Sequence, residues 1–187
     1  TTDAAGLADE AAAIYPALEA LDRTLALYPQ GFFAQFRNEL GEGGIQFLPV
    51  AAFHMDFSVI GLAFQSPEWY HVAYQVDAGS PEELLCHEIW HATENRLLDG
   101  DWAAIDSEAW NACNPAGFAY TFDYDQAMNG ADSRWLYFGE ATDVHFVDAY
   151  STMDPEEDRA RLMEYIVGSD DYADSLMQYP AMRQKLT

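Results

Sequence analysis

The chain has 187 residues, with 32 acidic and 8 basic side chains, which gives a formal net charge of −24. This charge argues against binding to nucleic acid or to an anionic membrane surface, because both need clustered Lys and Arg. It does not indicate disorder, since 50% of the residues are hydrophobic and 14% are aromatic. The length suits one domain that spans residues 1–187.

The cysteines and the hydropathy pattern bear on the compartment. Cys86 and Cys113 are too few for a disulfide scaffold, and the sequence leaves open whether they pair or stay buried as thiols. No stretch reads as a signal peptide or as a membrane span. The acidity and the scarcity of lysine favour a secreted or cell-envelope protein, with its signal or anchor segment absent from this chain.

The first third of the chain is expected to be helical and is followed by strands. Apolar residues recur at steps of three and four from Leu7 to Leu25, through Ile14 and Leu18, with Pro16 interrupting the pattern. A shorter helix is expected around residues 32–40. Runs rich in aromatic and β-branched residues then predict a small antiparallel sheet with strands at 45–50, 59–64 and 69–76.

Two strong helix starts organise the remainder. The sequence SPEE at Ser80 combines a capping residue, a proline at the first helical position and acids in the first turn, and it predicts a helix to about Leu98. The sequence DPEE at Asp154 predicts a second such helix to about Val167. The other expected elements are a helix over 102–112, an aromatic loop over 114–129 and a short helix from Pro180. We therefore expect an α+β fold, mostly helical, with the sheet packed beside the helix that follows Ser80.

That helix carries the sequence HEIWH from His87 to His91, an HExxH motif. Residues four apart lie one turn apart on one helix face, so both imidazoles can ligate one zinc at about 2.0–2.1 Å. Glu88 then flanks the metal and can take a proton from a water that zinc activates. The opposite face should anchor the helix in the core through Leu85, Ile89 and Ala92. The alternative is a pair of ordinary helix histidines with a solvated glutamate.

A catalytic zinc needs a third protein ligand and an open position. The metzincin extension of the motif would need Gly and His where this chain has Glu94 and Leu97, so that class is excluded. The third ligand must therefore come from further along the chain. The candidates are Glu108, Glu140 and Glu157.

A second motif, YSxxDPxExxA, runs from Tyr150 to Ala160 and places a tyrosine seven residues before Glu157. Together with the HExxH motif, it resembles the catalytic domain of anthrax lethal factor and the related bacterial Pro-Pro endopeptidases, which are zinc metallopeptidases of the gluzincin type. The likeness covers residues 80–187 and implies a zincin-like fold. It further implies zinc as the cofactor, held by His87, His91 and Glu157, with Glu88 as the general base and Tyr150 as the donor to the oxyanion.

Other interpretations of these residues stay open. Glu157 could complete a capping box with Asp154 instead of binding metal. His145 could take the place of Tyr150 as the oxyanion donor. Glu94 could accept a hydrogen bond from a ligand imidazole, or it could lie on a solvated face.

The sequence thus predicts a zinc-dependent peptidase that acts on a peptide or protein substrate, with no nucleic-acid partner and no membrane span. The alternative is a binding or interaction domain of the cell envelope with a vestigial or structural zinc site. The presence of Glu88 argues against that alternative, because a structural site has no use for a base.

Overall fold

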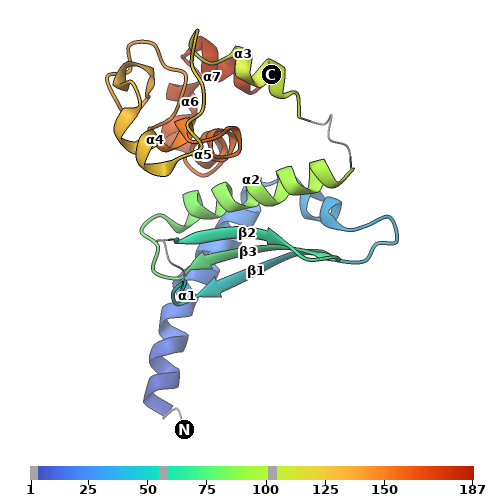
Figure 1. The fold of residues 1–187 in the computed structure, drawn as a ribbon. Coiled ribbons are helices and arrows are strands. Elements are labelled where there is room, and N and C mark those ends of the chain that lie inside the picture. Colours follow the sequence, from blue (N-terminus) through green and yellow to red (C-terminus); the bar gives the residue numbers. More distant parts are fainter. Residues whose placement is uncertain (1–3, 55–58, 101–104) are drawn as a thin grey trace. The chain divides into compact units, whose positions relative to one another are not determined.

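The computed structural model describes residues 4–54, 59–100 and 105–187 (Figure 1). Backbone contacts divide the chain into two compact units, Thr1–Arg96 and Leu97–Thr187. The fold is α+β, as the sequence predicts. Among the described residues, no helix combines the length and the apolar character that crossing a membrane requires.

The first unit contains the sheet and the helix with the HExxH motif. Its elements are α1 (Ala4–Leu27), the 3-10 helix η1 (Phe32–Phe36), β1 (Gly44–Val50), β2 (Gly61–Gln65), β3 (Trp69–Gln75) and α2 (Pro81–Gly100). The three strands and the helix after Ser80 lie where the sequence predicts them. The helix expected around residues 32–40 is limited to η1, because the chain is already extended at Arg37, which forms a β-bridge with Gly43.

The sheet is mixed, with β3 between β1 and β2 (Figure 1). β2 and β3 pair antiparallel, as expected, because the short turn from Ser66 to Trp69 joins them directly. β1 pairs parallel to β3, so the antiparallel prediction is wrong for this pair. The connection between β1 and β2 is long enough for β3 to enter between them.

The core of the first unit lies between the sheet and α2. The alternate residues Tyr70, Val72 and Tyr74 of β3 share one face of the sheet. They pack into one buried cluster with Leu85, Ile89 and Ala92 of α2, the anchoring face that the sequence predicts. The packing beside the sheet therefore fixes which face of α2 is turned away from the core.

The buried side of helix α1 coincides only in part with the predicted apolar face. Ile14 and Leu18 are 38% and 42% exposed, whereas Ala17 and Ala20 are buried. The Tyr74 hydroxyl donates a hydrogen bond of 3.1 Å to the carbonyl of Ala17. Small residues allow the helix to approach the sheet closely, Leu21 packs against the core, and Ile14 and Leu18 are left exposed. Pro16 lies inside this helix, which continues through it.

The second unit consists of short helices around a buried aliphatic cluster, against which aromatic side chains pack. They are α3 (Ser107–Ala112), α4 (Tyr124–Gly130), η3 (Ser133–Trp135), η4 (Tyr150–Thr152), α5 (Pro155–Val167), α6 (Asp170–Leu176) and α7 (Pro180–Lys185). α5 and α7 match the predicted helices. α4 lies inside the expected loop, α6 was not expected, and the predicted start of a helix at Trp102 lies outside the described residues.

Candidate metal centre

The two histidines of the HExxH motif converge on one point beside α2. The Nε2 atoms of His87 and His91 are 3.1 Å apart, and their rings meet at 77°. Two nitrogens that each lie about 2.0–2.1 Å from one tetrahedral zinc are about 3.3–3.4 Å apart. The helix thus presents two nitrogen ligands at close to the spacing that a single zinc ion requires.

The start of α2 explains why this segment is helical. The carbonyl of Ser80 accepts the first helical hydrogen bond, from the backbone N–H of Leu84, at 3.0 Å. Pro81 supplies a preset backbone angle at the first position, and acids in the first turn complement the helix dipole. The sequence signals for this helix and for its histidine face are therefore confirmed.

The side chain of Glu88 extends from α2 toward strand β2. Its side chain is buried, with 6% of the residue exposed. The carboxylate lies against Gly61, the first residue of β2, at a point where that strand carries no side chain. The alternative of a solvated glutamate is therefore excluded, because the Glu88 side chain is buried.

Glu94 is also buried, with 3% of the residue exposed. This excludes the solvated-face alternative for a residue that follows His91 by almost one turn. Its predicted role as a hydrogen-bond acceptor for a ligand imidazole stays a prediction.

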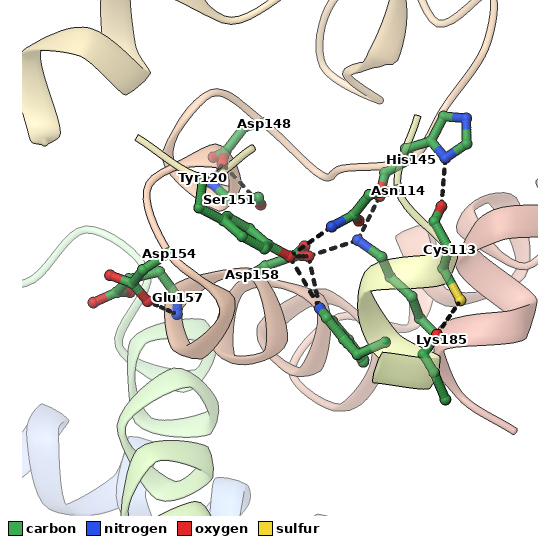
Figure 2. Close-up of polar contacts among 12 residues, drawn as sticks. Cys113, Asn114, Tyr120, His145, Asp148, Ser151, Asp154, Glu157, Asp158 and Lys185 are labelled. Atoms are coloured by element: carbon green, nitrogen blue, oxygen red, sulfur yellow. Dashed lines mark hydrogen bonds and ion pairs between the residues drawn. The ribbon is translucent and has the colours of Figure 1, made fainter. Parts of the chain in front are cut away.

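Glu157 lies at the beginning of α5 in the second unit. Asp154 caps this helix, and its Oδ1 accepts a hydrogen bond of 2.9 Å from the Glu157 backbone N–H (Figure 2). This is the Asp154 half of the predicted capping box. The cap fixes the backbone of Glu157, whose part as a zinc ligand stays a prediction from the sequence.

The other two candidates for the third ligand lie at the surface of the second unit. Glu108 is exposed in the first turn of α3. Glu140 is exposed as well, and its Oε1 accepts a hydrogen bond of 2.8 Å from the Ser133 hydroxyl. Glu157 is partly buried. Burial therefore favours Glu157, because a carboxylate sheltered from water binds a cation more strongly.

Tyr150 begins the 3-10 helix η4, and its ring packs 5.9 Å from that of Tyr124. The turn is tied to the preceding segment by Asp148, whose Oδ1 accepts hydrogen bonds from the backbone N–H and the hydroxyl of Ser151 (Figure 2). Asp148 in turn forms an ion pair with Arg161 of α5. The second unit therefore contains the predicted oxyanion donor in a well-anchored turn.

His145 makes contacts that compete with the alternative role as oxyanion donor. Its Nδ1 lies 2.6 Å from the carbonyl of Cys113 (Figure 2). Its Nε2 lies 3.4 Å from the carboxylate of Asp143. Both ring nitrogens are thus engaged within the second unit. This arrangement favours Tyr150 over His145.

The neighbour of Glu157 anchors α5 to the rest of the second unit. Oδ2 of Asp158 accepts hydrogen bonds from Lys185 at 2.6 Å, from the Tyr120 hydroxyl at 2.7 Å and from Trp110 Nε1 at 3.0 Å (Figure 2). Burial raises the pKa of Asp158 and lowers that of Lys185, and each group opposes the shift of the other. The ammonium of Lys185 also lies 4.4 Å from the centre of the Phe146 ring.

Sequence reasoning missed this buried pair. A lysine near the end of an acidic chain is usually solvated, so no sequence signal indicates its burial. The sequence also gave no role to Gly61, because a glycine in a strand normally indicates only a weak point. The two cysteines are buried free thiols, which resolves that open alternative.

The aromatic residues of the predicted loop have mixed positions. Phe118 and Trp135 line a hollow of about 700 Å³ in the second unit, together with polar side chains of α4. Phe122 and Tyr124 are 74% and 57% exposed. Tyr120 and, from the preceding helix α3, Trp110 donate hydrogen bonds to Asp158.

No protein-family model, curated protein or solved structure matches this chain.

Proposed function

We propose that the chain is a zinc-dependent peptidase in which His87, His91 and Glu157 hold the metal. The three residues each offer one ligand atom, two imidazole nitrogens and one carboxylate oxygen. This donor set leaves a fourth tetrahedral position open, as catalytic zinc sites require. The observation that carries the proposal is the 3.1 Å separation of the two Nε2 atoms on the helix that also buries Glu88.

When bound, zinc lowers the pKa of water to about 7 and polarises a carbonyl oxygen. Glu88 accepts the proton of the attacking water and delivers it to the leaving amine, which is the role of a general base that turns general acid. The Tyr150 hydroxyl donates a hydrogen bond to the oxygen on which negative charge develops. The residues proposed for hydrolysis therefore come from three segments of the chain, α2, η4 and α5.

A peptide is the substrate class that the surroundings of Glu88 favour. β2 is an edge strand, because it pairs with β3 on one side only in the described sheet. Such a strand has backbone N–H and C=O groups available to an extended peptide, which can join the sheet as a further strand. Glu88 lies against this strand at Gly61, so a peptide on that edge would run past the base.

The test combines metal analysis with hydrolysis. We expect the purified chain to bind about one zinc ion and to cleave members of a peptide library. We expect Glu88→Ala to keep the zinc and lose cleavage, because Glu88 is a base and not a ligand. Zinc binding with no cleavage of any peptide would instead support the binding domain with a structural zinc site. A Glu88→Ala variant with full activity would exclude the proposed mechanism.

A further inference from the structure

Gly61 occupies a position where a side chain would collide with Glu88. A Cβ atom built on Gly61 would lie 2.4 Å from Oε1 of Glu88 and 2.8 Å from its Cδ. It would also lie 2.7 Å from Cδ1 of Leu84, one turn earlier on the same helix. Cβ atoms essentially never come closer than 3.0 Å to other heavy atoms, so the flexible ends of Glu88 and Leu84 would have to shift. The carboxylate of Glu88 therefore occupies space that only glycine leaves free.

The backbone at Gly61 does not itself require glycine. The glycines with positive φ are Gly31, Gly41, Gly43, Gly44 and Gly117, and Gly61 is not among them. Any residue could therefore adopt its backbone conformation, and most would stabilise the strand more than glycine does. Glycine at position 61 therefore serves to leave space for neighbouring side chains, and its conformational freedom is not used.

The direction of the missing side chain follows from the strand register. Gly61 is paired with Tyr74 of β3, so side chains at these two positions point to the same face of the sheet. Tyr74 packs in the core cluster with Leu85 and Ile89 of α2. A side chain at residue 61 would therefore point toward α2, because the strand register fixes the face of the sheet on which it lies.

We propose that Gly61 is a positioning residue for Glu88, which lets the carboxylate lie between α2 and the edge strand instead of being pushed along the helix. This inference rests on the proposed function for its catalytic consequence, but its steric part is independent of any metal. A misplacement of about 1 Å in a reacting group can lower a rate about 100-fold. Gly61→Ala should therefore reduce kcat about 100-fold, with KM and zinc content unchanged.

The decisive experiment is a double-mutant cycle on the metal-free protein. Gly61→Ala should lower the urea midpoint of unfolding, and it should lower it less in a Glu88→Ala background, where Leu84 remains the only close neighbour. Gly79→Ala is the matched control, because a Cβ at Gly79 meets no atom within 4 Å. We expect the control to unfold at the wild-type midpoint and to keep wild-type activity.

Each outcome of the cycle decides the proposal. If Gly61→Ala lowers the urea midpoint equally in the wild-type and Glu88→Ala backgrounds, the proposal is overturned. A Gly61→Ala variant with unchanged urea midpoint and kcat would overturn it as well. If Gly61→Ala alone does not fold, folding of the double variant supports the proposal. A double variant that stays unfolded would show that the clash with Leu84 prevents folding, and it would overturn the proposal. If the wild type cleaves no peptide, the proposed function fails, while the cycle still decides whether Gly61 makes room for Glu88.

Discussion

Nε2 of His87 lies 3.1 Å from Nε2 of His91, one turn further along the same helix. Two neutral imidazoles at this distance can share one hydrogen bond, or they can direct both lone pairs at one cation. The second arrangement needs only a change of tautomer and a small shift, because both rings already face the same point. This geometry is what the proposed zinc site requires of the pair.

Loss of a ligand should abolish tight zinc binding. We expect His87→Ala and His91→Ala to weaken zinc binding more than about 100-fold, since changes at residues behind a ligand already cost 10–100-fold. Competition with a chromophoric chelator measures the dissociation constants. An unchanged affinity in either variant would show that the pair only shares a hydrogen bond.

The third ligand can be identified by matched amide substitutions. We expect Glu157→Gln to weaken zinc binding strongly, because the amide oxygen carries no charge. Glu108→Gln and Glu140→Gln serve as controls and should bind zinc as the wild type does. If Glu157→Gln binds zinc normally and one control does not, the ligand is that other acid.

Tyr150 should act on kcat and not on binding. Removing one donor from an oxyanion site lowers kcat about 10²–10³-fold, so Tyr150→Phe should lose that factor while KM and zinc content stay the same. Tyr124→Phe is the control, because its ring packs against Tyr150. Equal losses in both variants would point to a packing role for Tyr150.

The buried pair Asp158–Lys185 should respond differently to single and double substitution. Neither side chain is more than 1% exposed. We expect Asp158→Asn to lower the free energy of unfolding by about 3–5 kcal/mol, because it leaves a buried ammonium without its counter-ion. Asp158→Asn combined with Lys185→Met should recover most of that loss in urea unfolding. A double variant as unstable as the single one would show that the loss comes from Tyr120 and Trp110.

The cysteines should react slowly until the chain unfolds. Burial raises the pKa of the Cys113 thiol, so at pH 8 less of it is thiolate than of an ordinary thiol with a pKa of about 8.5. Its reaction with a disulfide reagent should therefore accelerate at a higher pH than for a free thiol. In denaturant both Cys86 and Cys113 should react at once. A single fast thiol in the native state would contradict the burial, and none after unfolding would indicate a disulfide.

The sequence predicts the helix of the candidate site well, for identifiable reasons. The cap at Ser80 and the apolar spacing of Leu85, Ile89 and Ala92 are local signals, and local signals decide where an amphipathic helix begins and which face it buries. The two strong caps at Ser80 and Asp154 both start helices in the structure. The face of α2 that carries His87 and His91 follows directly from this periodicity.

What the sequence does not predict depends on contacts between distant residues. β1 joins the sheet beside β3 through backbone pairing that the individual strands do not specify. α6 has the sequence DDYADSL, which contains too few apolar residues to show a helical periodicity. The roles of Gly61 and Lys185 arise only from what lies next to them, so neither could be read from residue type or spacing.

The burial of Lys185 has a practical consequence. It is the sole lysine of the chain, beside seven arginines, and its side chain is fully covered. Reagents that acylate side-chain amines therefore find no accessible lysine while the second unit is folded. The rate at which this single amine becomes labelled would report opening of that unit, with no need for an introduced probe.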